Sequence, residues 1–223
     1  MIAKYQKKNI KKKLSTVQIL ELCKLEKKQH YPLIKYAKKM KIYFLSSAFD
    51  FGSVDFLNKL NLKYQKIPSV EITNFRTLYH HGKHKNKVIL STGMSDLKEI
   101  QKALTILLLG YKNKPVKHKL IKNFSKKDNI ILKKYVYLLH CVSNYPTKIE
   151  NLNLRCIKLL KHKFNLTVRF SDHTLSLTAS SYAVSLGAEI IEKHITLDKN
   201  MVGPDHKSSI LPNEFKIMVN NIR

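Results

Sequence analysis

The stretch KVILSTG, residues 87–93, reads as a strand that is buried on both faces and turns polar at its end. Its apolar residues follow one another without alternation, which is typical of parallel strands covered by helices on both sides. The stretch YVYLLHC, residues 135–141, has the same form. The sequence therefore favours an α/β fold built around a parallel sheet.

Six such runs alternate with helical segments along the chain. We expect one helix to run from a cap at Ser95 to Leu109 and stop at Gly110, and a second to cover residues 178–186 and stop at Gly187. This alternation predicts a single, incomplete (β/α)8 barrel of the TIM type, with about six βα units within residues 1–223. The expected strands are residues 42–49, 64–69, 87–93, 135–141, 167–173 and 189–197.

The polar residues of these runs are concentrated where each strand ends. In a β/α barrel the carboxyl ends of all strands lie on one face, so such residues surround one pocket. An open doubly wound sheet would instead bind ligands at a switch point, and the sequence has no GxGxxG phosphate fingerprint to support one. The strand-end residues are Ser46, Ser47, Lys66, Ser69, Ser91, Thr92, His140, Ser143, Ser171, Asp172, His173, Glu192, Lys193 and His194.

His173 and His194 end two consecutive strands, which in a barrel brings their imidazoles to neighbouring positions. Two imidazoles with open water positions would hold a divalent metal that acts as a Lewis acid on a carbonyl. Each histidine taken singly is more often a hydrogen-bonded core residue. The metal site is therefore a hypothesis that depends on the pair.

Lys66 and several hydroxyl groups lie at the other strand ends, a set suited to a phosphate and a carboxylate. The alternative is that these serines only form turns and caps. A further three residues are suited to sugar hydroxyls, although as isolated residues they are more often ordinary loop groups. The hydroxyls are those of Ser47, Ser69, Ser91 and Ser171, and the sugar candidates are Glu71, Tyr145 and Asp205.

The chain has 223 residues, a formal net charge of +27 and 43% hydrophobic residues, enough for a sizeable core. The charge alone would suggest a nucleic-acid partner that binds residues 1–13 and 112–134. However, the basic residues are mostly Lys without interleaved aromatic residues, and a strongly AT-biased genome would produce this composition. Nucleic acid is therefore the less favoured partner, and residues 112–134, with nine Lys and one Asp, are predicted to form a basic surface insertion with room for one short helix.

The longest apolar run, residues 103–109, is too short for a membrane span, and charged residues interrupt any hydrophobic segment after the basic N-terminus. Cys23, Cys141 and Cys156 are odd in number and widely spaced in apolar surroundings, which predicts buried thiols rather than disulfides. We therefore expect a cytoplasmic protein with no membrane segment.

Seven segments, in order along the chain, resemble the sialic acid synthase family, which includes the legionaminate, pseudaminate and spore-coat polysaccharide synthases. The motifs SDHT, EKHITLD and GPDH are together highly specific. The segments are FLSSAFD (44–50), YQKIPSVEITN (64–74), VILSTGMS (88–95), LLHCVSNYP (138–146), FSDHTLS (170–176), SLGAEIIEKHITLD (185–198) and GPDHKSSILPNEF (203–215).

The resemblance implies a homodimeric TIM-barrel enzyme that joins phosphoenolpyruvate to an N-acetylated hexosamine such as N-acetylmannosamine and releases phosphate. Carried over position by position, it assigns His173 and His194 to a divalent metal, manganese or magnesium, that polarises the sugar aldehyde. The positions that match phosphoenolpyruvate-binding residues are Lys66, Ser69, Ser91, Ser171 and Ser47, with Ser143 nearby, and those that match sugar-binding residues are Glu71, Tyr145 and Asp205.

The chain also departs from the family pattern. The resemblance implies two earlier barrel strands and a small antifreeze-like domain after the helix that begins near Pro212, and no segment of the sequence matches either. Val70 and Arg169 stand where the family usually has Gly, which would crowd the pocket, and Ala48 replaces a usual Pro. The alternatives to a synthase are a non-catalytic truncated remnant of such an enzyme and, less favoured, a basic nucleic-acid binder.

Overall fold

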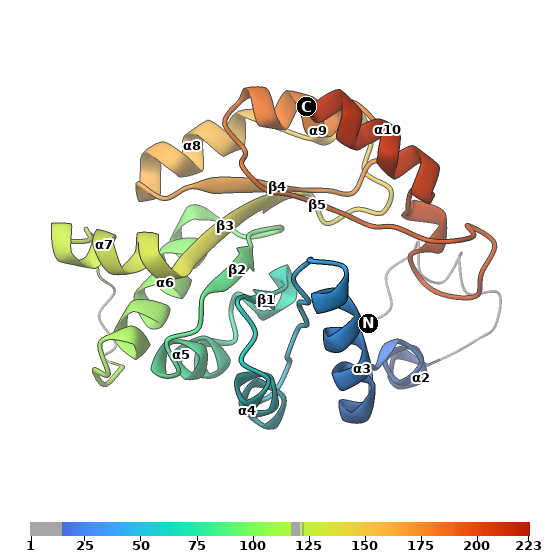
Figure 1. Cartoon of the computed structure of the whole chain (residues 1–223). Coiled ribbons are helices and arrows are strands. Elements are labelled where there is room, and N and C mark those ends of the chain that lie inside the picture. Colours follow the sequence, from blue (N-terminus) through green and yellow to red (C-terminus); the bar gives the residue numbers. More distant parts are fainter. Residues whose placement is uncertain (1–14, 117–120, 122) are drawn as a thin grey trace.

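The computed structural model describes residues 15–116, 121 and 123–223. Its centre is a five-stranded parallel sheet in which each strand pairs with the next one along the chain (Figure 1). This order, with at least one helix between consecutive strands, is the arrangement of half a β/α barrel. The strands are β1 (Gln65–Ile67), β2 (Val88–Ser91), β3 (Val136–Cys141), β4 (Val168–Asp172) and β5 (Ile191–Lys193).

Helices lie along the outer side of the sheet and follow its curve (Figure 1). Each crossover through a helix returns the chain to the start of the next strand, as parallel pairing requires. The helices are α2 (Thr16–Cys23), α3 (Lys27–Lys39), α4 (Phe51–Lys59), α5 (Phe75–Lys83), α6 (Leu97–Tyr111), α7 (Lys126–Tyr135), α8 (Arg155–Phe164), α9 (Ala179–Ser185) and α10 (Pro212–Ile222), with short 3-10 turns η1 (Ser69–Glu71), η2 (Ile149–Asn151) and η3 (His206–Ser208).

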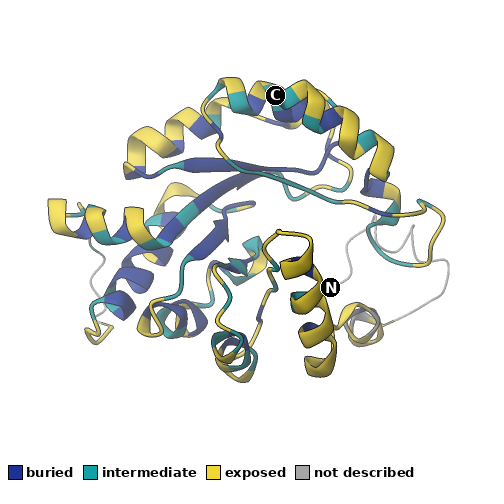
Figure 2. Cartoon of the chain, in the orientation of Figure 1, coloured by how far each residue is buried: buried dark blue, intermediate teal, exposed yellow. Residues whose placement is uncertain are grey.

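The hydrophobic core lies between the strands and the outer helices. Leu90, Leu138 and Phe170, from three neighbouring strands, are fully buried in one cluster with Leu104 and Leu107 of α6. Figure 2 shows the sheet largely buried and the outward faces of the helices exposed. Burial on both faces explains why the strands are continuously apolar in sequence.

The boundaries of α6 differ from those expected. Asp96 is its N-cap rather than Ser95, because Asp96 and Glu99 each accept a backbone hydrogen bond from the other and close a capping box. Gly110 does not stop the helix, which continues to Tyr111. A Cβ on Gly110 would lie 2.8 Å from the Cα of Gly82, so this glycine allows α5 and α6 to pack closely.

Residues 42–49 do not form the first expected strand. They contribute a single parallel bridge, between Ser47 and Lys66, beside β1. Ile42, Tyr43 and Phe49 are more than half exposed, so the run lacks the burial on both faces that an apolar strand needs. The described part of the chain therefore has five strands, and the expectation of a sixth at this position is wrong.

Residues 112–134 contain the one short helix that the sequence left room for, and this helix packs into the core. Most of α7 lies within them, and its Leu132 is fully buried in the main core cluster. Residues 117–120 and 122 lie outside the described residues. The lysines were a misleading signal because α7 is amphipathic and directs them outward while its apolar side packs inward.

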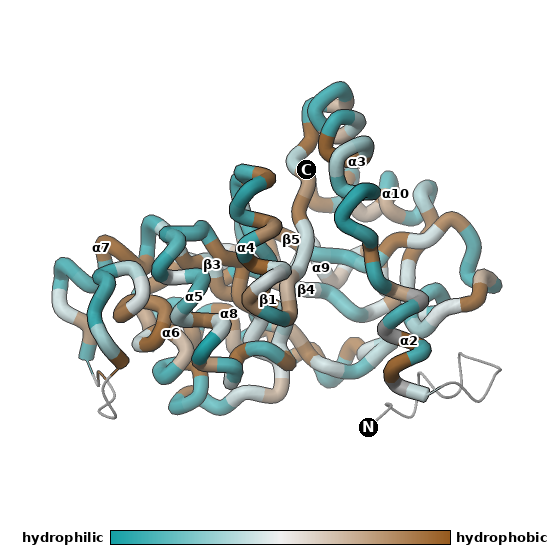
Figure 3. Tube along the Cα trace, turned by 90° about the horizontal axis from the view of Figure 1, so that it is seen from below, coloured by the Kyte–Doolittle hydropathy of each residue, from teal (hydrophilic) through white to brown (hydrophobic). Residues whose placement is uncertain are grey.

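All three cysteines are free thiols, but only Cys141 is buried: Cys23 is exposed on α2 and Cys156 is partly buried, so the prediction of buried thiols is wrong for Cys23 and only partly met at Cys156. Among the described residues, no helix combines the length and hydrophobicity that crossing a bilayer would take. Figure 3 shows hydrophilic and hydrophobic positions mixed along the outer helices.

Candidate active site

The two outermost strands of the sheet meet through their side chains. The Nζ of Lys66, on β1, lies 3.0 Å from Oε1 and 2.9 Å from Oε2 of Glu192, on β5. Three strands separate β1 from β5, so this contact requires a sheet curved enough for its first and last strands to face each other. The concave interior is therefore where the strand-end residues converge.

Glu192 is bound on a second side by Ser171 of β4, whose hydroxyl donates to Oε1 over 2.6 Å. Burial raises the pKa of the Glu192 carboxyl, but the charge of Lys66 and the hydrogen bonds from Ser171 and Lys66 outweigh this and hold the pKa below its ordinary value. The ionised carboxylate balances the charge of Lys66 and orients its ammonium group within the site.

His173 and His194 directly follow β4 and β5, and their ring centroids are 5.3 Å apart. Nδ1 of His173 lies 2.7 Å from the carbonyl oxygen of Val142. Burial lowers the pKa of His173 to about 4; the Val142 hydrogen bond opposes this shift and the neighbouring His194 adds to it. A neutral ring whose Nδ1–H donates to a carbonyl presents the lone pair of Nε2 to the site.

The surroundings of this lone pair suit a cation. Nε2 of His173 is 3.1 Å from the hydroxyl of Ser171, whose single proton is already donated to Glu192. Oδ2 of Asp205 lies 3.9 Å from Nδ1 of His194, and its Oδ1 is buried without a hydrogen-bond partner among the described residues. Imidazole and carboxylate are ligand types that divalent metals use, so the chemistry of these groups fits a metal, although their ligand atoms do not already converge within 4.8 Å of one another.

Tyr145 covers the two histidines. Its ring centroid lies 4.1 Å from that of His173 and 5.4 Å from that of His194. It belongs to the loop after β3 and precedes Pro146 through a cis peptide bond. Of the three residues assigned to sugar binding, Tyr145 and Asp205 are thus brought to the histidine pair.

Gly93 is surrounded by the side chains of Ser69, Cys141 and Ser143. The N–H of Gly93 donates to Oγ of Ser69 over 3.0 Å. A Cβ at position 93 would collide with Oγ of Ser143 and lie 2.9 Å from both Oγ of Ser69 and Sγ of Cys141. Glycine at this position therefore allows these polar side chains to pack against the backbone at the ends of β2 and β3, close to the buried Ser91.

Glu71 and Ser47 lie at the margin of this site. The carboxylate of Glu71 accepts a hydrogen bond from Nδ2 of Asn74 over 2.7 Å, within the turn that follows β1. Ser47 is exposed, and its bridge to Lys66 is made by the backbone. Val70, which we expected to crowd the pocket, is 63% exposed.

Arg169 is buried but its guanidinium points away from the histidines. It lies 4.0 Å from the ring centroid of Tyr137 and donates over 3.2 Å to the carbonyl of Thr167 and over 3.2 Å to Glu189. These partners are near the starts of β3, β4 and β5, at the end of the sheet opposite the candidate site. Arg169 therefore fills the interior below the site and does not crowd it.

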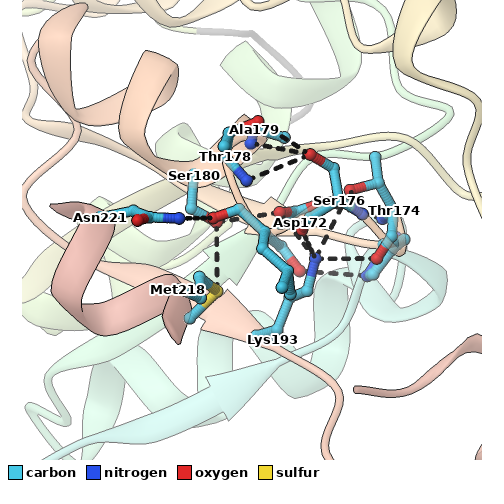
Figure 4. Close-up of polar contacts among 12 residues, drawn as sticks. Asp172, Thr174, Ser176, Thr178, Ala179, Ser180, Lys193, Met218 and Asn221 are labelled. Atoms are coloured by element: carbon cyan, nitrogen blue, oxygen red, sulfur yellow. Dashed lines mark hydrogen bonds and ion pairs between the residues drawn. The ribbon is translucent and has the colours of Figure 1, made fainter. Parts of the chain in front are cut away.

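A buried ion pair joins the two strands that carry the histidines. Nζ of Lys193 lies 2.8 Å from Oδ2 of Asp172, and their side chains are 2% and 0% exposed. Lys193 also donates to the carbonyls of Thr174 and Ser176, while the hydroxyl of Ser180 donates to Asp172 (Figure 4). Because each partner directly precedes a histidine, the pair fixes how the two imidazoles face each other.

Some of these contacts have weak sequence signals or none. Glu192 has no role in the sequence-based assignment, although an acidic residue at a strand end is notable in a chain with 15 acidic and 42 basic residues. The packing of Ser69, Cys141 and Ser143 around Gly93 depends on the approach of separate loops in space. The hydrogen bond between His173 and the carbonyl of Val142 could not be predicted from the sequence, because every residue carries a backbone carbonyl.

The sequence matches the NeuB family over residues 1–223. It is 45% identical to the N,N'-diacetyllegionaminic acid synthase of Campylobacter jejuni over 221 residues, which cover 99% of this chain and 60% of that protein. It is 31% identical to the N-acetylneuraminate-9-phosphate synthase of Drosophila melanogaster, over 91% of this chain and 49% of that protein. The chain thus spans about half to three-fifths of the length of these relatives.

Solved structures agree with the sequence match. The N-acetylneuraminic acid synthetase of Leptospira borgpetersenii, in complex with citrate, superposes with a TM-score of 0.76 and 30% identity over 92% of this chain and 65% of that one. A truncated 3-deoxy-D-arabino-heptulosonate 7-phosphate synthase from Thermotoga maritima has a TM-score of 0.68 at 16% identity, over 89% of this chain and 71% of that one, and shows the shared fold alone. With its curved parallel sheet, its strand-end histidines and a family match that extends from residue 1 to residue 223, the chain belongs to the NeuB family.

Proposed function

We propose that this chain carries the catalytic barrel of an enzyme that condenses phosphoenolpyruvate with an N-acetylated hexosamine, giving a nine-carbon 2-keto acid sugar and phosphate. The observation that supports this most directly is the convergence of His173, His194 and Lys66 in one strand-end site. A metal-binding pair beside a fixed cation suits a reaction between a carbonyl and a phosphorylated acid. The relatives in C. jejuni and L. borgpetersenii are named for legionaminic and N-acetylneuraminic acid.

His173 and His194 are the residues proposed to hold the divalent ion, manganese or magnesium. When bound, such an ion would polarise the sugar aldehyde as a Lewis acid. The chain prepares the site by keeping Nε2 of His173 unprotonated through the Nδ1–H bond to Val142. It also holds the carboxylate of Asp205 beside His194, where it can bind either the ion or a sugar hydroxyl.

Phosphoenolpyruvate carries a phosphate and a carboxylate, and both need cationic or hydroxyl donors. We propose that Lys66 contributes the cation, oriented by Glu192, and that serine hydroxyls complete the pocket. The close packing around Gly93 supports this assignment because it gathers the hydroxyls of Ser69 and Ser143 at the ends of β2 and β3. The serines are Ser69, Ser91, Ser171 and Ser143, with Ser47 at the margin.

The sugar is proposed to lie against Tyr145 and Asp205, next to the histidine pair, with Glu71 contributing from the turn after β1. This arrangement would bring the aldehyde carbon to C3 of phosphoenolpyruvate, and these two atoms form the new carbon–carbon bond. Water then adds at C2, and phosphate leaves with cleavage of the C–O bond, so that the product carries a ketone. We further propose that the enzyme acts in the cytoplasm as a homodimer.

Phosphate release tests the proposal. The protein is purified from the cells that produce it, its intact mass is compared with 26.0 kDa, and it is assayed with phosphoenolpyruvate, N-acylated hexosamines and manganese or magnesium. Release should require all three components. His194→Ala should abolish release without changing the circular dichroism spectrum, whereas His162→Ala, on the exposed side of α8, should retain it. A folded protein that binds metal but releases no phosphate with any N-acylated hexosamine would support the non-catalytic remnant instead.

A further inference from the structure

A second group of metal-ligating side chains lies outside the candidate active site, between two outer helices. Asp55 comes from α4, His80 from the last turn of α5, and His84 is the C-cap of α5. Residues four apart on a helix lie on the same face, so the two histidines point together toward α4. His81, between them in sequence, is fully buried.

The three side chains already converge on one point. Nε2 of His80 lies 2.7 Å from Oδ1 of Asp55, and Nε2 of His84 lies 3.2 Å from the same oxygen. One ligand atom from each residue lies within 4.8 Å of both others. Zinc bonds of 2.0–2.1 Å in a tetrahedron place neighbouring ligand atoms about 3.3 Å apart, so little rearrangement would be needed.

The backbone and packing hold this arrangement. The N-cap of α5 is Asn74, whose side chain accepts from the N–H of Thr77, and the ring of Phe51 lies 5.0 Å from that of His80. The side chains of His80, His84 and Asp55 are 25%, 40% and 50% exposed, so water can reach the group and complete a coordination shell. Fixed ligands with solvent access are what a three-residue site requires.

We propose that Asp55, His80 and His84 form a structural binding site for a divalent transition-metal ion, with zinc as the best fit. Two imidazoles and one carboxylate suit zinc, nickel or copper, whereas magnesium prefers oxygen ligands alone. The site lies at the end of α5 from which the chain enters β2 at Val88, opposite the strand ends that carry the candidate active site. The ion would join α4 to α5 and stabilise that side of the sheet.

Zinc titration by calorimetry tests the site in a His173→Ala, His194→Ala background, which removes the histidines of the candidate active site. One zinc ion per chain should bind. Adding His80→Ala and His84→Ala should abolish this binding, whereas adding His162→Ala, an exposed histidine on α8, should leave it unchanged. In the chain with His173 and His194 intact, the His80 and His84 substitutions should lower the zinc stoichiometry by one.

Thermal unfolding gives a second readout that does not depend on catalysis. Because an ion that binds the folded state alone stabilises it by mass action, zinc should raise the melting temperature of the background protein, and magnesium should not. Asp55→Asn, which keeps a hydrogen-bond acceptor beside both histidines, should weaken zinc binding while the circular dichroism spectrum stays unchanged. Equal zinc stoichiometry with and without His80 and His84 would overturn the proposal and leave the three residues as a hydrogen-bonded surface cluster.

Discussion

Three consecutive residues at the end of β5 make contacts on alternate faces of the sheet. Glu192 faces the interior and binds Lys66, whereas Lys193 faces the outer helices and binds Asp172. His194 returns to the interior beside its partner histidine. Successive side chains of a strand point to opposite faces, so the order Glu-Lys-His places a carboxylate and an imidazole inside and the buried cation of Lys193 outside.

The buried pair of Lys193 and Asp172 leads to a prediction about stability. Lys193→Met should lower the free energy of unfolding by about 3–5 kcal/mol, because the fully buried carboxyl of Asp172 would lose its ion-pair partner. Urea denaturation measures the change. Lys199→Met is the matched control: Lys199 and Glu214 also form an ion pair, but their side chains are 34% and 33% exposed, so the cost should stay below about 1 kcal/mol. Equal costs for the two variants would show that the buried pair does not stabilise β4 and β5.

Individual elements differ in how well the sequence predicts them. The runs that became β2 and β3 are buried on both faces, and their continuous apolar residues identified them. Residues 42–49 have similar composition but only β1 beside them, and their large apolar side chains remain exposed. Composition alone does not distinguish a central strand from an edge segment, because the difference lies in the neighbours.

Helix α7 provides a prediction at the scale of one element. Leu132→Ala should destabilise the protein by about 2–5 kcal/mol, because a fully buried leucine leaves a cavity in the main core. Ile130→Ala, on the same helix but 68% exposed, should change stability by no more than about 0.5 kcal/mol. Chemical denaturation of both variants measures the contrast. If Leu132→Ala leaves the stability nearly unchanged, α7 would be a surface insertion and not part of the core.

At the scale of the whole molecule, the net charge of +27 dominates the electrostatics. Raising NaCl from about 0.01 M to about 0.15 M shortens the screening length from about 30 Å to about 8 Å, which weakens repulsion among the lysines. The melting temperature should therefore rise with salt. A variant with Lys28, Lys35 and Lys39 of α3 changed to Gln, all exposed positions, should respond less. A melting temperature that falls with salt would mean that attractive ion pairs outweigh the repulsion.

The sequence by itself determined the alternation of strands and helices, the gathering of polar residues at strand ends and the resemblance to the synthase family. A central parallel strand is buried on both faces and is therefore apolar along its whole length. Such a strand can be recognised from a short stretch of sequence. The motifs SDHT and EKHITLD contain His173 and His194, so these two residues could also be identified from short stretches of sequence. The structure brought the two rings to 5.3 Å, as the barrel arrangement predicted.

Only the tertiary structure decided which distant residues touch. Lys66 and Glu192 are 126 positions apart, and their ion pair exists because the sheet curves until its outer strands face each other. The close packing around Gly93 and the group of Asp55, His80 and His84 likewise depend on how loops and helices approach in space. Local sequence fixes the period and burial of each element, whereas curvature and packing angles arise when all elements share one core.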